Sequence, residues 1–327
     1  MKPPPDSIIE LIEAFRRSKT MFTALSMGVF DRTPAALSEL AAGLKAEPDA
    51  LERLLDGCRG LGLLKLEDGR YTNTEVAEVY LRRASPHTLA GYIGYSDRAL
   101  WRLWANLEDA VREGSNRWNQ TFGWEGPIFT NLFRTPESRH EFLLGMHGFG
   151  VISSPKVVTA FDLSGFRRLV DLGGATGHLA MAAVEHYPGL RAAVFDLAAV
   201  VEAARQFVDE RVELIAGDFF TDALPEADLY AVGRILHDWD ETKIRALLAR
   251  INARLPVGGG LLIAERLLSA DKSGPLGVQM QSLNMLVCTE GKERTAAEYE
   301  ALLREAGFTS VESRITGAPL DAVLARK

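Results

Sequence analysis

Residues 170–178 read VDLGGATGH, the pattern expected where a buried strand turns into a helix. Glycines in such a turn let the backbone bend tightly and approach a ligand at the N-terminus of the following helix. A dinucleotide-binding turn would have glycines at its first, third and sixth positions. Counted from Gly173, the third position is Ala175 and the sixth is His178, so this turn does not fit a dinucleotide.

The acid and the glycines of this turn have instead the spacing found in methyltransferases that bind S-adenosylmethionine (SAM), namely Asp171, Gly173 and Gly177. A carboxylate at the end of the strand would repel a pyrophosphate, whereas it favours the ammonium and sulfonium groups of SAM. We therefore expect SAM to be the cofactor.

Strand-like and helical segments alternate from residue 167 onward, which implies a mainly parallel sheet covered by helices on both faces. The last two strands are joined by residues 317–319, a link too short for a crossover, so these strands must be antiparallel. We expect strands at 167–172, 190–196, 211–216, 227–233, 258–265, 309–316 and 319–325. The pattern predicts an α/β, Rossmann-like seven-stranded methyltransferase domain over residues 166–327.

Acidic residues end the second and third of these strands. Asp196 is placed to accept the ribose hydroxyls of a nucleoside, although a helix N-cap is the alternative role. The third strand ends in Gly217, Asp218 and Phe219, which offer an acid for an adenine amine and an aromatic ring for its face. Because carboxyl ends of parallel strands bind ligands in sheets of this type, these residues complete a predicted cofactor site.

The fourth strand leads into His237, one of six histidines in the chain. Methylation of a phenol requires removal of a proton whose pKa is about 10, and a histidine suits that task. An isolated histidine would more often be a structural core residue. Glu265 and Glu293 are the two candidates for orienting its ring, and Arg234 is expected to hold the cofactor's polar end or to neutralise Asp238.

The first 95 residues read as helices followed by a small hairpin with Asp68-Gly69 at its bend, a winged-helix pattern. Such a module dimerises many enzymes, and it binds DNA in other proteins. The mixture of acidic and basic residues here favours dimerisation. Residues 96–165 are helical and rich in aromatic residues, and we expect them to form a linker that lines an acceptor pocket.

The composition excludes several classes of protein. A net charge of −7 argues against a general nucleic-acid binder, and two cysteines are too few for a disulfide framework or a cysteine zinc site. We therefore expect a cytoplasmic protein without a bound metal. The N-terminus lacks a signal-peptide core, and no apolar run is long enough to span a bilayer, so no membrane partner is expected.

Residues 236–241 (LHDWDE) and 291–295 (GKERT) resemble signatures of the metal-independent, dimeric small-molecule O-methyltransferases of plants and bacteria. Within that family the chain resembles the acetylserotonin (hydroxyindole) O-methyltransferases and the acetylserotonin methyltransferase-like protein. The resemblance extends over nearly the whole chain, and its further stretches are residues 71–75, 109–114, 159–164, 217–220 and 282–287.

The resemblance implies that His237 is the general base, oriented by Glu265 and Glu293, in a homodimer formed by the N-terminal domain. It implies that the acceptor is a small aromatic hydroxyl compound, a phenol or a hydroxyindole. Residues implied in cofactor binding are Asp196, Gly217, Asp218, Phe219, Arg234 and Phe133. Residues implied in acceptor binding are Trp101, Phe129, Phe142, Met146, Asn284 and Met285.

Three residues depart from the family pattern. Ala175 replaces a glycine, Phe133 stands where tyrosine is common, and Cys288 stands where the acetylserotonin enzymes carry glutamine. Some relatives use iron, but their site needs a second histidine, and no histidine follows His237. A catalytically silent cofactor-binding paralogue and a winged-helix regulator are the alternative functions.

Overall fold

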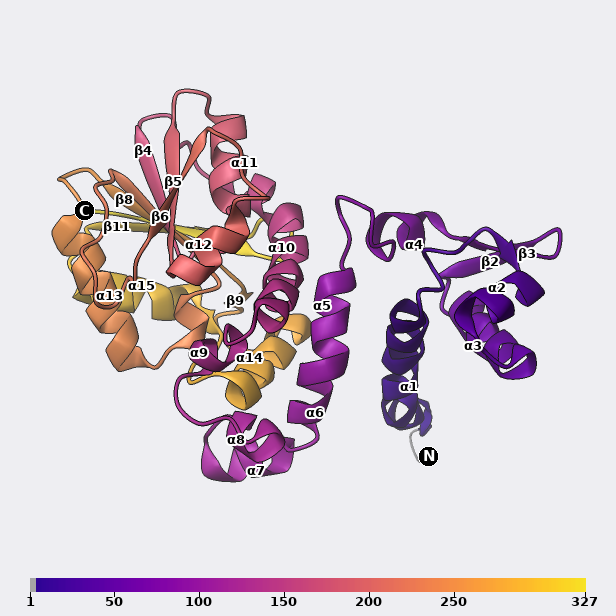
Figure 1. Ribbon diagram of the computed structural model, residues 1–327. Coiled ribbons are helices and arrows are strands. Elements are labelled where there is room, and N and C mark those ends of the chain that lie inside the picture. The colour runs from indigo at the N-terminus through magenta and orange to yellow at the C-terminus, as the bar shows by residue number, and fades with distance from the viewer. Residues whose placement is uncertain (1–3) are drawn as a thin grey trace. The chain divides into compact units, whose positions relative to one another are not determined.

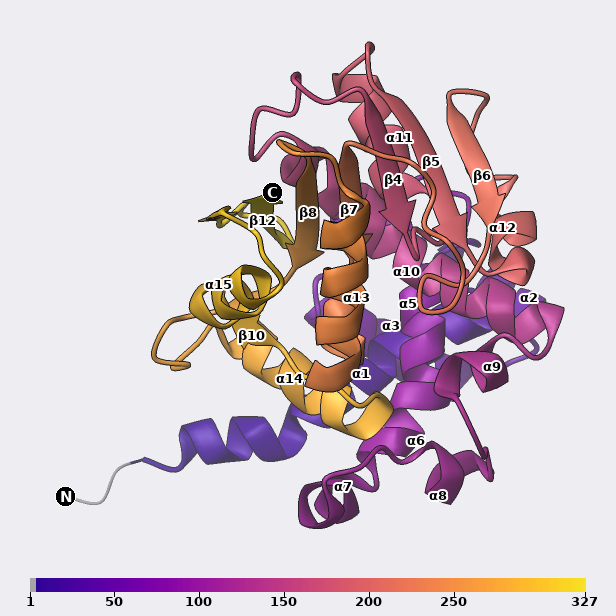
Figure 2. The ribbon, with the colours of Figure 1, turned by 90° about the vertical axis from the view of Figure 1, so that its left-hand side faces the viewer.

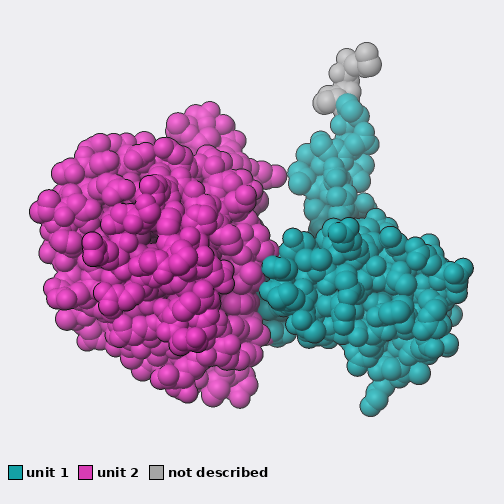
Figure 3. Space-filling view, turned by 90° about the horizontal axis from the view of Figure 1, so that it is seen from above, with its two compact units in different colours: residues 1–98 teal, residues 99–327 magenta. Residues whose placement is uncertain are grey.

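A seven-stranded sheet is the centre of residues 99–327, the larger of the two units into which the chain divides; the smaller is residues 1–98 (Figure 3). The computed structural model describes residues 4–327. The strand order is β11-β12-β8-β7-β4-β5-β6, in which β12 runs in the direction opposite to the other six strands (Figure 1). The strands are β4 (Arg168–Leu172), β5 (Arg191–Asp196), β6 (Val212–Ala216), β7 (Leu229–Gly233), β8 (Gly260–Glu265), β11 (Ser310–Arg314) and β12 (Asp321–Arg326).

Helices cover both faces of the sheet (Figure 2). Successive residues of β4 point to opposite faces, so Val170 packs in the core with α13 and α15 while Leu169 packs with α10 and α11. The helices of this unit are α6 (Trp101–Trp104), α7 (Leu107–Glu113), α8 (Trp118–Phe122), α9 (Ile128–Leu132), α10 (Pro136–Val158), α11 (His178–His186), α12 (Ala198–Ala204), α13 (Glu241–Arg254), α14 (Leu276–Cys288) and α15 (Ala296–Glu305). A short pair, β9 (Leu267–Leu268) and β10 (Arg294–Thr295), forms a separate parallel ladder.

The seven predicted strands are confirmed, with every boundary within two residues of its expected place. The last two strands pair antiparallel, with Ser310 opposite Arg326, as the short link between them requires. Side chains cap the N-termini of α13 and α15. The Asp240 carboxylate accepts the amide hydrogen of Lys243, and a capping box joins Thr295 to Glu298.

The smaller unit has a winged-helix arrangement with the expected hairpin. Asp68 and Gly69 both have positive φ, 51° and 72°, as the two-residue turn of a twisted hairpin requires. Its elements are α1 (Asp6–Met27), β1 (Ala35–Ala36), α2 (Leu37–Leu44), α3 (Pro48–Gly60), β2 (Leu64–Glu67), β3 (Arg70–Asn73), α4 (Glu75–Tyr80) and α5 (Ala90–Tyr95), followed by a π-helical turn at Ser96–Leu100.

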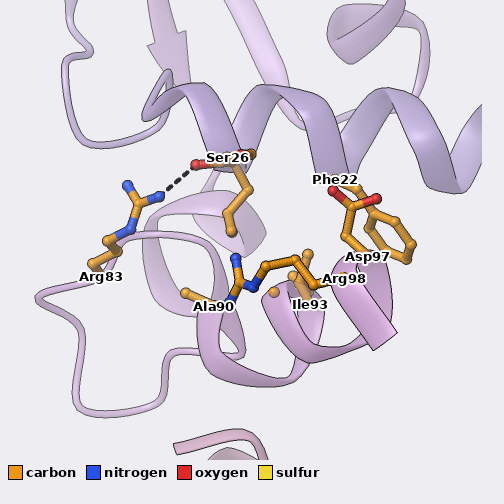
Figure 4. Close-up of a pocket in the computed structure, with 9 residues that line it drawn as sticks. Phe22, Ser26, Arg83, Ala90, Ile93, Asp97 and Arg98 are labelled. Atoms are coloured by element: carbon orange, nitrogen blue, oxygen red, sulfur yellow. Dashed lines mark hydrogen bonds between the residues drawn. The ribbon is translucent and has the colours of Figure 1, made fainter. Parts of the chain in front are cut away.

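A small pocket lies beside α1 and α5 in this unit (Figure 4). Its walls include Phe22, Leu25 and Ile93, with the guanidinium groups of Arg83 and Arg98 at its edge. None of the site residues predicted from the sequence lines it. Within residues 4–327, no helix combines the length and the apolar character needed to cross a membrane.

Candidate active site

The turn after β4 lies at the carboxyl edge of the sheet, and none of its three glycines has room for a side chain. Gly173 and Gly177 have φ of 68° and 74°, values that L-residues rarely adopt. A Cβ on Gly173 would lie 2.5 Å from Cδ1 of Ile235, and one on Gly177 would lie 2.5 Å from Cγ1 of Val208. The two glycines predicted from the sequence are therefore required by the geometry of the turn.

The Asp196 carboxylate holds this turn in place. One of its oxygens accepts the Ala175 amide hydrogen at 2.9 Å, and the other accepts that of Leu197 at 2.7 Å. Burial raises the pKa of Asp196 to about 6, although both amide hydrogen bonds act in the opposite direction. Ala175 has φ of 50°, a left-handed conformation that costs an alanine roughly 1 kcal/mol. The bond from Asp196 therefore stabilises the strained residue of the turn.

The Asp171 carboxyl group is buried beneath the turn, with 1% of its surface exposed. One oxygen lies 2.6 Å from where a Cβ on Gly174 would stand, and neither oxygen has a hydrogen-bond partner within residues 4–327. Burial, with Asp196 nearby, raises the pKa of Asp171 well above its usual range. A buried carboxyl group without a partner fits a cationic ligand, because a nearby positive charge would favour its ionised form.

The turn after β6 meets the turn after β4. The Gly217 amide donates to the Asp196 carbonyl at 2.9 Å, and the Phe219 ring approaches to 3.2 Å from the Cβ position of Gly173. One oxygen of Asp218 accepts the Phe220 amide hydrogen at 2.8 Å. The predicted loop, ribose and adenine residues therefore gather at one edge of the sheet.

His237 is 3% exposed and lies in a short 3₁₀ turn, Leu236–Asp238, that follows β7. Its Nδ1 is 2.8 Å from Oε1 of Glu293 and 3.4 Å from Oε2 of Glu265. Its Nε2 is 3.6 Å from Oδ1 of Asp238, beyond hydrogen-bond distance. Glu293 is therefore the hydrogen-bond partner of the ring, a choice that the sequence left open.

Glu265 has a different task. Its Oε1 accepts the amide hydrogens of Ile235 and Leu236, each at 3.0 Å, and more weakly that of His237 at 3.4 Å. These three bonds shape the backbone on which His237 stands. Gly291 also fixes this backbone, because a Cβ at position 291 would lie 2.2 Å from the His237 carbonyl oxygen and would displace it.

The carboxylates around His237 determine its charge. Burial by itself lowers the pKa of His237, but Glu265, Glu293 and Asp238 outweigh it and raise that pKa to about 9. Burial raises the pKa of Glu265 to about 7, with His237 acting in the opposite direction. The three carboxylates around His237 therefore stabilise the imidazolium that forms when the ring accepts a proton.

The same cluster could also hold a metal ion, because His237, Glu265 and Glu293 offer ligand atoms within 4.8 Å of one another. The hydrogen bond of Glu293 to Nδ1 of His237 and those of Glu265 to three backbone amides account for the positions of these side chains without a metal ion. The expectation of a metal-free site stays a prediction.

Arg234 has a left-handed backbone conformation. It has φ of 57°, and its amide donates to the Ala264 carbonyl, so the segment before His237 does not coil as one helical turn. Its guanidinium lies 5.7 Å from the centre of the Phe149 ring. Burial raises the pKa of Asp238 to about 6 and lowers that of His178 to about 3, and the positive charge of Arg234 acts in the lowering direction on both groups.

An aromatic cluster contains three of the residues expected to bind cofactor or acceptor. Phe129 contacts Phe133, Phe142 and Trp239 with ring centres 5.9, 6.2 and 5.5 Å apart. Trp239 also meets Phe220 edge-on at 5.1 Å. The cluster therefore joins α9 and α10 to the segments that follow β6 and β7.

The other predicted acceptor residues come from three helices. Asn284 and Met285 are buried in α14, Met146 is half-buried in α10, and Trp101 in α6 is 36% exposed. The Asn284 amide oxygen accepts the Trp104 indole hydrogen at 2.9 Å.

Several participants were not assigned a role from the sequence. Trp104 and Trp239 were visible only as members of an aromatic-rich chain, although Trp239 lies within the LHDWDE stretch. Cys288 was noted only as a departure, and its thiol donates to the Asn284 amide oxygen at 3.7 Å. The contacts of Trp104 and Trp239 join segments far apart in the chain, so no local pattern signals them, whereas Cys288 and Asn284 are one helical turn apart in α14.

Comparison with known proteins gives a family for both units. A family model of the O-methyltransferase domain matches residues 104–309, and one of the O-methyltransferase dimerisation domain matches residues 9–83. Acetylserotonin O-methyltransferase of Gallus gallus is 44% identical over 337 residues, covering 99% of this chain and 97% of the relative.

Two solved structures are similar over their full length. Human N-acetylserotonin methyltransferase in complex with SAM has a TM-score of 0.96 and 41% identity, covering 100% of this chain and 98% of that one. PigF with SAH has a TM-score of 0.89 and 28% identity, covering 99% and 100%.

Proposed function

This chain belongs to the O-methyltransferase family with an attached dimerisation domain, and we propose that it methylates a hydroxyindole of the N-acetylserotonin kind with His237 as the base. The predicted fold class, SAM as cofactor and O-methyl transfer are confirmed by the family and by the SAM-bound relative. The identity of the acceptor and the roles of individual residues are proposals.

The observation that carries the proposal is the geometry of His237. Glu293 accepts a hydrogen bond from Nδ1, which leaves Nε2 as the nitrogen available to an acceptor hydroxyl. Asp238 lies beside the ring, with its Oδ1 3.6 Å from Nε2. Ile235 packs against Gly173 of the cofactor turn, so the base and the cofactor site share one edge of the sheet.

SAM, when bound, supplies an electrophilic methyl group on a cationic sulfur. We propose that the unpartnered carboxyl of Asp171 and the Gly173–Gly177 turn receive its charged end, with Asp196 and the Gly217–Phe219 turn at its nucleoside. Nε2 of His237 takes the hydroxyl proton, and Glu293 stabilises the imidazolium that forms. The acceptor oxygen bonds to the methyl carbon while the carbon–sulfur bond breaks and its electron pair stays on sulfur.

The acceptor proposal rests on the relatives named above and on an aromatic wall suited to a flat ring. The residues proposed to line the acceptor site are Trp101, Phe129, Phe142, Met146, Asn284 and Met285, and Phe133 is proposed to contact the cofactor. Cys288 hydrogen-bonds Asn284, so this departure from the family stands next to a proposed acceptor residue.

The test is turnover of methyl-labelled SAM against N-acetylserotonin, other hydroxyindoles and simple phenols, with and without a chelator. We expect a hydroxyindole to be the best acceptor and the chelator to have no effect. His237→Ala should lower kcat roughly 10²- to 10⁴-fold while the Kd for SAM stays within about twofold. His140→Ala, at an exposed histidine of α10, is the control. Unchanged turnover by His237→Ala would rule it out as the base, and preference for a simple phenol would overturn the acceptor.

We infer three functional parts: residues 1–95 for dimerisation, 96–165 as the linker that lines the acceptor site, and 166–327 for SAM. Helix α1 exposes Ile8, Leu11 and Ile12 to 60%, 71% and 62%, a surface that favours burial in a homodimer. A cytoplasmic location stays an expectation from the two unpaired, buried cysteines.

A further inference from the structure

Helix α10 makes two hydrogen bonds to the start of the cofactor-binding segment. Nδ1 of His147 is 2.8 Å from the Thr176 hydroxyl, which lies inside the glycine-rich turn and is fully buried. Two turns further along α10, the Ser154 hydroxyl is 2.9 Å from Nδ1 of His178, the first residue of α11. Neither histidine takes part in the proposed proton transfer.

Gly150 lies between these two contacts on the same face of α10, because residues 147, 150 and 154 are three and four positions apart. A Cβ on Gly150 would lie 2.1 to 2.3 Å from three atoms of the His178 ring. The imidazole therefore fills the space that a side chain at position 150 would need. Burial, with His147 and Arg234 nearby, lowers the pKa of His178 to about 3, so the ring is neutral at physiological pH.

The adjacent face of α10 points toward the proposed acceptor wall. Phe142 contacts Phe129 and Phe133, and the Phe149 ring lies beside the guanidinium of Arg234. A single helix therefore contacts the turn that receives SAM on one face and the residues proposed to meet the acceptor on the next.

We propose that His147 and His178 are positioning residues that fasten the SAM-binding turn to α10, so that SAM and the acceptor bind cooperatively. The positioning role of the two histidines rests on the proposed SAM site alone, and the cooperativity rests on the proposed acceptor site as well. The hydrogen bond with His147 fixes the orientation of Thr176 in the turn. The His178 ring packs into the space beside Gly150 and so fixes the start of α11 against α10. When SAM binds and orders the turn, α10 is held in the position that favours acceptor binding. Because such coupling is reciprocal, bound acceptor raises the affinity for SAM by the same factor.

The test measures the Kd for SAM by calorimetry in His147→Leu, with His140→Leu on the same helix as the matched control. Loss of one hydrogen bond predicts a Kd for SAM raised about 3- to 10-fold, with kcat at saturating substrates within about twofold of wild type. His147→Gln, which can still bond the Thr176 hydroxyl, should restore most of the affinity. If His147→Leu binds SAM as tightly as wild type, the inference is wrong.

Cooperativity is measured separately with S-adenosylhomocysteine, which cannot react, titrated with and without N-acetylserotonin. We expect the acceptor to tighten binding in wild type and to do so less in His147→Leu. Equal tightening in both would overturn the coupling, whereas absence of any acceptor effect in wild type would count against the proposed acceptor too. Thr176→Val removes the same bond from the other side and replaces His147→Leu if that variant does not fold.

A second pair tests His178 through its steric partner. Gly150→Ala should displace the imidazole and weaken SAM binding, and adding His178→Ala should recover part of the loss because the clash disappears. If Gly150→Ala leaves the Kd for SAM unchanged, His178 has no positioning role.

Discussion

Replacing Glu293 by glutamine removes the charge that lies nearest to the proposed base while keeping an oxygen that can accept from Nδ1 of His237. In the wild type these atoms are 2.8 Å apart, and Glu293, with Glu265 and Asp238, overcomes the effect of burial and raises the pKa of His237. Loss of one carboxylate must therefore lower that pKa. The ring keeps its orientation, so the change isolates charge from geometry.

The size of the shift follows from the distance. Two unit charges 2.8 Å apart in a medium of effective dielectric constant near 20 attract by about 6 kcal/mol, which is an upper bound for this pair. Close opposite charges in proteins shift a pKa by about 1 to 3 units, and Glu265 and Asp238 remain in the variant. We therefore expect a decrease of roughly 1 to 2 units, equivalent to about 1.4 to 2.7 kcal/mol.

The assay is the pH dependence of kcat/KM for the acceptor at saturating SAM. His237 works as a base only when neutral, so the rate rises as pH passes its pKa, and the rise should move to lower pH in Glu293→Gln. Glu290→Gln is the matched control, because Glu290 is partly exposed and its carboxylate pairs with Lys243 at 2.6 Å. If kcat/KM rises at the same pH in Glu293→Gln and in wild type, the rise does not report the pKa of His237 and the reasoning is refuted.

Two further predictions concern cofactor charge and assembly. Asp171→Asn should raise the Kd for SAM about tenfold or more, since an amide cannot balance a cation. Folding raises the pKa of Asp171, so the free energy of unfolding falls as pH rises above the pKa that this group has in the unfolded chain. The asparagine variant has no group to titrate here and does not lose this stability. Its Tm should therefore exceed that of wild type near pH 7.5 and match it near pH 4; a lower Tm at both would contradict the argument. Leu11→Asp on the exposed face of α1 should convert a dimer into a monomer by light scattering, whereas Val257→Asp, at a residue 92% exposed in the larger unit, should not. A dimer retained by Leu11→Asp would argue against α1 as part of the interface.

Much of the fold could be predicted because its signals are local. The hairpin turn at Asp68-Gly69, the capping box at Thr295 and the link at residues 317–319 each depend on neighbouring residues. The cofactor turn was recognisable because positive φ at Gly173 and Gly177 restricts which residues can stand there. The conformation of Arg234 could not be predicted, since a non-glycine residue with positive φ is held by a contact to the neighbouring strand β8, which no local pattern reveals.

The amino-acid sequence alone determined the α/β class, the order of the strands along the chain, the SAM site at the strand ends and His237 as the candidate base. Strand periodicity, glycine and short-range spacing carry this information, because they depend on residues close together in the chain. The tertiary structure decided that Glu293 bonds the imidazole while Glu265 supports the backbone beneath it. It also brought His147 to the cofactor turn and Trp104 to Asn284. These pairs are 28 to 180 residues apart, and only the packing of whole helices and strands sets the distance between their side chains.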